Sequence, residues 1–160
     1  MVFFAVFVML FFMACERKSH ETSGFIELPQ KGWAYNDTLS FFNGNHKYHN
    51  RVDSIDNYKL TICVDYSPSY RYKNLWVEVS GTDGLNKKEV HDTVFLEMSD
   101  STERWLGTGI ASNYQVLSNP IIRNLDLRKP IIIRHIMRTD TLRAINRVGI
   151  FVESIDQSRN

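Results

Sequence analysis

The sequence predicts an all-β protein, an antiparallel β-sandwich of jelly-roll or immunoglobulin-like type. Apolar residues alternate with polar ones in several short segments, which is the pattern of half-buried strands. Turn residues separate these segments at close spacing. No segment shows helical periodicity over about ten residues, the length near which a helix becomes recognisable. Short strands joined by close turns are typical of a sandwich.

The chain opens with an apolar segment, MVFFAVFVMLFFMAC, which has no charged side chain and ends at Cys15. As a helix, Val2 to Ala14 would span about 20 Å, whereas the hydrocarbon core of a bilayer is roughly 30 Å thick. We therefore interpret residues 1–14 as a signal peptide rather than a membrane span. The last four residues of the segment resemble a bacterial lipobox, which implies cleavage before Cys15 and acylation of this cysteine. A plain signal peptide or an apolar strand is the alternative.

The rest of the chain divides into a tether and one domain. Residues 15–24 are mostly polar and reach a glycine, so we expect an acylated N-terminus and a flexible tether there. Residues 25–160 contain no repeat or low-complexity tract, so we expect a single β-sandwich domain. The mature part, after Cys15, carries all of the 19 basic and 18 acidic side chains, a balance that predicts no nucleic-acid partner. Cys63 has no cysteine partner once Cys15 is acylated, and we expect a half-buried thiol in a strand.

The first strands follow from local patterns. Residues 25–42 contain apolar bursts broken by Pro29 and Gly32, which indicates two brief strands. Asn43-Gly44 is a tight-turn signal, and residues 45–57 are polar and aperiodic, as in a loop. The clearest alternation in the chain follows and places these side chains on one face of a half-buried strand: Tyr58, Leu60, Ile62, Val64 and Tyr66.

The later strands follow from the same periodicity. Leu75 to Val79 alternates with Trp76 on the opposite face, and Gly81 to Gly84 forms the next turn. The following strand has Thr93 and Phe95 on one face and these residues on the other: Val90, Asp92, Val94, Leu96 and Met98. The domain then continues through Trp105 to Leu117, a β-branched strand at Lys129 to Arg138, a connector at Asp140 to Asn146 and a last strand at Val148 to Val152.

No combination of residues indicates a catalytic centre, a cofactor or a metal site. His46 and His49 are three residues apart in a polar loop, without a third ligand nearby. Asp53 and Asp56 lie in the same loop, where carboxylates are usually solvated. The Gly107-Thr108-Gly109 segment neither follows a clear strand nor opens a helix, which argues against a phosphate-binding loop. We therefore predict that the protein is not an enzyme.

Two groups of residues leave alternatives open. Trp33, Trp76 and Trp105 could form a sugar-stacking surface, or they could be core and sheet-covering residues. A stacking surface would make the protein a surface glycan-binding β-sandwich lipoprotein. The second group consists of three arginines and one aspartate near the last strands, which could form a charged rim or be ordinary solvated charges: Arg134, Arg138, Arg143 and Asp140.

Four stretches, in this order and spacing, together point to a known family. They are Cys15 with Phe25-Ile26-Glu27-Leu28-Pro29 and Gly32-Trp33; Tyr70-Arg71-Tyr72-Lys73-Asn74-Leu75-Trp76-Val77; Asp92-Thr93-Val94 through Trp105-Leu106-Gly107-Thr108-Gly109; and Ile136-Met137-Arg138 with Asp140, Leu142, Ile145, Val148-Gly149-Ile150 and Glu153. Over most of its mature part, the chain resembles the gliding-motility lipoprotein family called GldH.

This resemblance implies a membrane-anchored accessory or scaffold lipoprotein of the bacterial gliding-motility and type IX secretion machinery. It would act through contacts with other envelope proteins, without a small-molecule ligand. The lipid-attachment residue would be Cys15, which carries palmitate-type acyl chains, and no catalytic residue is implied. We expect a lipid-anchored location in the cell envelope, at the outer membrane, with the periplasmic and surface sides both open.

Overall fold

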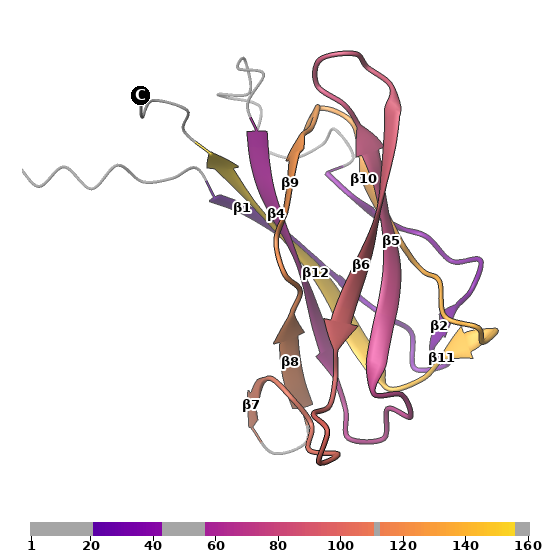
Figure 1. Cartoon of the computed structure of the whole chain (residues 1–160). Helices are drawn as coiled ribbons and strands as arrows, with labels where there is room; N and C mark the ends of the chain where they lie inside the picture. Colours follow the sequence, from indigo (N-terminus) through magenta and orange to yellow (C-terminus); the bar gives the residue numbers. More distant parts are fainter. Residues whose placement is uncertain (1–20, 43–56, 111–112, 156–160) are drawn as a thin grey trace, which may run out of the picture.

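The computed structural model describes residues 21–42, 57–110 and 113–155. The regular elements in these ranges are all β-strands, and they form two antiparallel sheets that face each other, with a third, two-stranded sheet beside them (Figure 1). Within these ranges there is no helix long and apolar enough to cross a membrane. The predicted all-β, antiparallel architecture is confirmed.

The first sheet has β4 at its centre. On one side β4 pairs with β12, and β12 pairs with β1. On the other side β4 pairs with β8 along one half and with β9 along the other, while β7 pairs with β8. The strands of this sheet are β1 (Glu21–Glu27), β4 (Asn57–Tyr66), β7 (Thr108–Ile110), β8 (Asn113–Leu117), β9 (Ile121–Asn124) and β12 (Ile145–Ile155).

The second sheet has the order β3-β10-β5-β6, so that β3 and β6 are its edges. Its strands are β3 (Leu39–Phe41), β5 (Asn74–Thr82), β6 (Glu89–Glu97) and β10 (Ile131–His135). The two-stranded sheet pairs β2 (Trp33–Ala34) with β11 (Thr141–Leu142).

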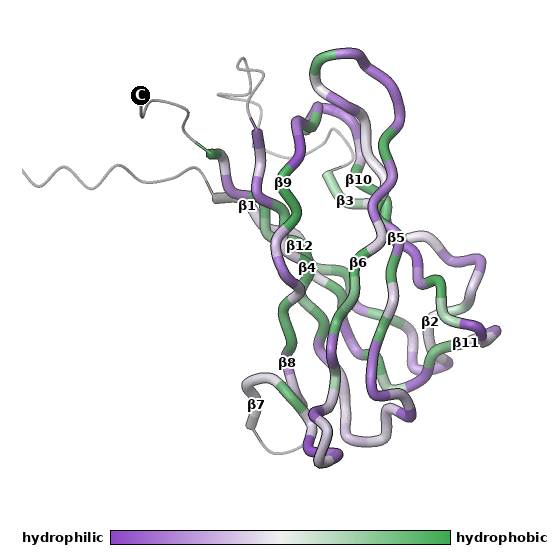
Figure 2. The backbone as a smooth tube through the Cα atoms, viewed as in Figure 1, coloured by the Kyte–Doolittle hydropathy of each residue, from purple (hydrophilic) through white to green (hydrophobic). Residues whose placement is uncertain are grey.

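The core fills the space between the two large sheets, and the alternation in the sequence determines which residues line it. Apolar and polar residues alternate along the strands of both sheets (Figure 2). All five residues predicted for the inner face of β4, from Tyr58 to Tyr66, are buried. From the second sheet, Leu75, Val94 and Leu96 pack into the same core. Each fully buried aliphatic side chain contributes about 1.5–3 kcal/mol to folding by leaving water.

Several boundaries differ from those that the sequence predicts. β1 begins at Glu21, so the last residues of the expected tether pair with β12 instead; polar residues suit this strand because it is an edge strand. The expected turn at Gly81 begins at Asp83, because β5 continues through Thr82 opposite Glu89. Residues 25–42 contain β2 and β3 in addition to the last three residues of β1. The Asn43-Gly44 turn and nearly all of the loop at 45–57 lie outside the described residues.

Two further differences concern the second half of the chain. The β-branched strand is shorter than expected and covers Ile131–His135, while the expected connector at Asp140 to Asn146 includes β11. The sequence pattern does not predict β9, which has only four residues and directly follows Pro120.

Candidate functional site

Several residues singled out from the sequence lie outside the described part of the chain. These are the proposed lipid-attachment residue Cys15, the loop histidines His46 and His49, and the loop carboxylates Asp53 and Asp56. Within the described ranges, no group of three or more His, Cys, Asp or Glu side chains is arranged to hold a metal ion.

The three tryptophans do not share a surface. Trp33 is 0% exposed; its indole N–H donates a hydrogen bond of 2.9 Å to the carbonyl oxygen of Asp37, and its ring lies edge-on to His135. Trp105 is half-buried and packs against Tyr66, with 5.8 Å between the ring centroids. Both are therefore packing residues, and Trp76 alone of the three is exposed.

Trp76 and Phe95 form an exposed aromatic pair on the outer face of the second sheet. They are opposite each other in the register of β5 and β6, with ring centroids 4.8 Å apart. Trp76 is 40% and Phe95 42% exposed. The alternation in the sequence places each residue on the face opposite the apolar residues of its strand, but their contact depends on the register of the two strands. Aromatic side chains are enriched at protein–protein interfaces, so this pair is a candidate contact surface.

A network of charged residues borders this aromatic pair on the same face. Glu78 accepts a 2.8 Å hydrogen bond from Nε of Arg134, which holds the pKa of Glu78 below its usual value. His91 lies between two carboxylates, 3.8 Å from Glu78 and 3.6 Å from Glu89. Arg134 is thus already neutralised by Glu78, whereas Glu89 leaves this face with excess negative charge.

Of the two alternatives for the charged residues near the last strands, the charged rim does not form as a unit. Arg134 pairs with Glu78, and none of Arg138, Asp140 and Arg143 makes an ion pair with another described residue. Arg138, Asp140 and Arg143 are exposed, as expected for ordinary solvated charges.

The outer face of the first sheet carries a different aromatic arrangement. The Phe25 ring lies over Gly149, where a Cβ atom would come within 2.4 Å of the ring, so this contact requires glycine. The Arg147 guanidinium lies 4.7 Å from the centroid of the Phe25 ring, and Phe151 packs edge-on against it. Arg147 in turn donates a 2.7 Å hydrogen bond to Asp65. Arg147 and Gly149 thus both lie against the Phe25 ring.

Leu117 and Ile122 are exposed on this same face, but they do not form a continuous patch. Their register partners on β4 are Cys63 and Lys59, which are four residues, or about 13 Å, apart along the strand. Single exposed apolar residues are normal on protein surfaces.

Cys63 is buried beneath this face, and only 1% of it is exposed. Burial raises the pKa of its thiol to about 12, with the Asp65 carboxylate acting in the same direction. The thiol therefore stays protonated at neutral pH and is a packing group rather than a nucleophile.

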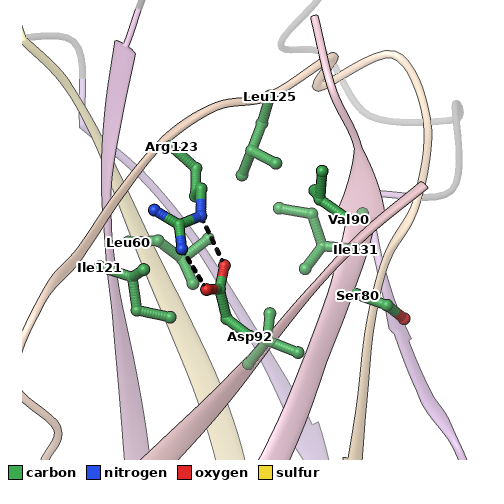
Figure 3. A pocket seen from close by; sticks show the side chains of 10 residues that line it. Leu60, Ser80, Val90, Asp92, Ile121, Arg123, Leu125 and Ile131 are labelled. Carbon is green, nitrogen blue, oxygen red and sulfur yellow. Dashed lines mark hydrogen bonds and ion pairs between the residues drawn. The ribbon is translucent and has the colours of Figure 1, made fainter. Parts of the chain in front are cut away.

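A small cavity lies between the two sheets on the side where β6 faces β9. Figure 3 shows Arg123 of β9 and Asp92 of β6 pointing toward each other across its mouth, with Leu60 and Ile131 among the residues that line it. The Arg123 Nε donates a 2.8 Å hydrogen bond to Asp92, and a second nitrogen of the guanidinium contacts the other carboxylate oxygen. The space open to the centre of a water molecule is about 10 Å³, which is far too small for an organic ligand.

The family model of the GldH lipoprotein matches residues 21–152. The chain belongs to the GldH lipoprotein family. No curated protein matches it. The resemblance expected from the sequence is thereby confirmed. GldH proteins are gliding-motility-associated lipoproteins and not a known enzyme family, and membership indicates a membrane-anchored place in the cell envelope.

The GldH match includes every described strand except the last three residues of β12. Both the aromatic pair and the link between Asp92 and Arg123 therefore lie in the part that matches the family. For a GldH lipoprotein, the described domain offers surfaces for contact, and the outer face of the second sheet is the candidate site.

Proposed function

We propose that this protein is a membrane-anchored scaffold lipoprotein of the gliding-motility and type IX secretion machinery, and that it acts by binding other envelope proteins. Acyl chains on Cys15 would hold it at the outer membrane. The observation that supports the scaffold role is the aromatic pair of Trp76 and Phe95, exposed on a rigid sheet. Large rigid aromatic side chains are the residues that most often dominate binding at protein interfaces.

The contact role is tested by recovering partners from cells with the anchored protein as bait. We expect the wild-type protein to recover components of the envelope machinery and a Trp76→Ala/Phe95→Ala variant to lose them. A Leu85→Ala variant is the matched control, because Leu85 is 67% exposed in the turn after β5, away from the pair. Normal secretion and movement of cells that lack the gene, together with no recovered partner, would overturn the proposal.

The anchor is tested by the intact mass of the protein extracted from membranes. We expect a diacyl or triacyl modification at Cys15 as the first residue, and release or lack of processing in a Cys15→Ala variant. A Cys63→Ala variant keeps the modification, since Cys63 is buried in β4. An unmodified Cys15 would remove the lipid anchor from the proposal.

The exposed aromatic pair also favours a second candidate function, glycan binding, because sugars stack on exposed tryptophan rings. Trp33 is buried and Trp105 packs half-buried against Tyr66, so the three tryptophans form no common stacking surface. Titration with soluble polysaccharides would then quench the fluorescence of Trp76, and Trp76→Ala would abolish the change. No quenching across a broad panel of glycans excludes this candidate.

A further inference from the structure

The free edge of β6 lies directly beside the aromatic pair. β6 has nine residues and pairs with β5 along one edge. Nowhere in the described ranges does a strand pair with its other edge. An edge strand of this length presents unpaired N–H and C=O groups, which another extended chain can use.

The hydrogen-bond pattern identifies which residues point outward. The Trp76 carbonyl oxygen accepts a bond from Ile136, so the backbone of Trp76 is directed toward β10. In an antiparallel sheet the direction alternates from residue to residue, so Leu75 and Val77 bond to β6 opposite Leu96 and Val94. It follows that Thr93, Phe95 and Glu97 direct their N–H and C=O groups to the free edge.

The two halves of this edge are protected differently. Inward-pointing charges are one way in which proteins prevent unwanted pairing at an edge strand. Asp92 points inward from β6 and is bridged by Arg123 from β9, which guards the first half of the strand (Figure 3). From Thr93 to Glu97 the edge has no such guard and contains neither proline nor glycine.

The chemistry of the open half defines the segment that fits it. Phe95 and Trp76 offer an apolar contact at the centre. Glu97, at the end of this half, is exposed and has no ion pair with a described residue. Residues two apart in a strand share a face. A complementary segment therefore carries an aliphatic or aromatic residue with Lys or Arg two positions away.

Resting on the protein-contact role proposed above, we propose that the edge of β6 from Thr93 to Glu97 is a docking edge for a partner protein. An extended, basic and apolar segment of the partner adds as a further strand to the second sheet. Its apolar side chain lies against Trp76 and Phe95, and its Lys or Arg pairs with Glu97. A second copy of this chain fits less well, since antiparallel pairing centred on Thr93 would put Glu89 opposite Glu97.

The test uses a defined peptide and the full chain in detergent micelles. The peptide acetyl-Thr-Lys-Thr-Ile-Thr-Lys-Thr-amide places both lysines and the isoleucine on one face when extended. On binding, we expect amide exchange at Thr93 and Phe95 to slow about tenfold, with no change at Val94 and Leu96, which already bond to β5. A peptide with Glu in place of Lys should bind at least about fivefold more weakly.

Matched proline variants separate edge pairing from face contact. Thr93→Pro removes an N–H that the fold does not use, and we expect about a tenfold loss of peptide affinity. Ser23→Pro is the control, because Ser23 lies on the edge strand β1. The Leu28 N–H donates to Asn146 on the β12 side, and the direction alternates along β1, so Ser23 also directs its N–H outward. Its peptide affinity should equal that of the wild type, and both variants should melt cooperatively.

Several outcomes would contradict the docking edge, and others separate it from the proposed function. No binding by the wild type, equal binding by Thr93→Pro, or binding that protects no alternating amides overturns it. Concentration-dependent dimerisation that Thr93→Pro abolishes would assign the edge to a second copy instead. If cells depend on the aromatic pair but the peptide protects no amides, the scaffold role stands without strand addition. If the peptide protects the edge but cells lacking the gene behave normally, the docking edge stands and the proposed function fails.

Discussion

β6 and the β8–β9 segment border the same open side of the sandwich, but the β8–β9 segment is interrupted and partly covered, whereas β6 is continuous and uncovered. The β8–β9 segment is interrupted at Ser118 to Pro120, and β7 covers the free edge of β8. β6 runs without a break from Glu89 to Glu97, and its second edge is open (Figure 1). Asp92 of β6 and Arg123 of β9 link the two through an ion pair and a hydrogen bond.

The difference teaches where the fold tolerates an unprotected edge. A break, a proline and a covering strand are general ways of preventing aggregation through an edge strand. The β8–β9 segment has all three of these features, whereas β6 has only the inward-pointing carboxylate of Asp92. An edge that stays open beside an exposed aromatic pair is the part of the molecule best suited to a partner.

The largest expected effect is a difference in stability between substitutions on the two faces of β6. Leu96→Ala should lower the free energy of unfolding by about 2–5 kcal/mol, since Leu96 is buried in the core. Phe95→Ala, on the other face of the same strand, should lower it by less than about 1 kcal/mol. Urea denaturation of the three proteins measures both changes. Equal losses would mean that Phe95 is a structural residue and would remove it from the contact surface.

The second prediction tests the break between β8 and β9. The buried Ile62 N–H donates a 3.0 Å hydrogen bond to the Ser118 hydroxyl, which takes the place of a ladder carbonyl. Ser118→Ala leaves this N–H without its acceptor, so we expect a loss of about 1–3 kcal/mol in unfolding free energy. Ser69→Ala, at an exposed turn, is the control and should change stability by less than about 0.5 kcal/mol. An unchanged midpoint for Ser118→Ala would show that the break needs no such support.

The third prediction concerns the buried His135, which lies away from both β6 and the β8–β9 segment. His135 is buried, its Nε2–H donates to the Trp33 carbonyl oxygen, and its Nδ1 has no partner in the described structure. Burial lowers the pKa of His135, so the folded state binds fewer protons than the unfolded state, whose histidine pKa is about 6.5. The free energy of unfolding is therefore at its full value above about pH 6.5. It falls as the pH drops below this value, by at most about 1.4 kcal/mol per pH unit.

Denaturation midpoints between pH 7 and pH 5 measure this effect. A His135→Gln variant keeps a donor for Trp33 and should lose the dependence in this range. Peptide binding at β6 should persist in both proteins as long as they remain folded. The same pH dependence in the variant would show that another group causes it.

The smallest expected effect concerns the link between the two strands. Arg123 and Asp92 have side chains that are 48% and 18% exposed, so solvent screens their ion pair. A double-mutant cycle with Asp92→Asn and Arg123→Gln should give a coupling of about 0.5–1 kcal/mol. If this link guards the first half of β6, the single variants should also extend amide protection by the peptide to His91. A coupling of zero, with protection still ending at Thr93, would show that the link guards nothing.

The parts of the fold that the sequence could predict are those with two chemically different faces. The strict alternation from Tyr58 to Tyr66 and from Val90 to Met98 identified β4 and β6, because one face of each strand is buried. β9 escaped notice, since four residues after Pro120 carry too short a pattern. The candidate site could be anticipated only in part: Trp76 and Phe95 were assigned to outer faces, but their contact depends on the register of β5 and β6.

Pairings between distant segments could not be predicted either. Asp92 stands among apolar residues on an inward face, and such a position signals that a buried or half-buried cation must be near. Its partner Arg123 comes from the other sheet, so identifying it requires the packing of the two sheets.

The position of β1 has a mechanical consequence. β1 is the first described strand, and it pairs with β12 at seven register positions, from Glu21 opposite Glu153 to Glu27 opposite Arg147. Hydrogen bonds in such a ladder lie perpendicular to the strands. A pull on the N-terminal end of β1 along its axis loads the whole ladder in shear, whereas peeling would break the bonds one after another. A domain held to a membrane through this end would resist force from moving machinery with all of these bonds at once.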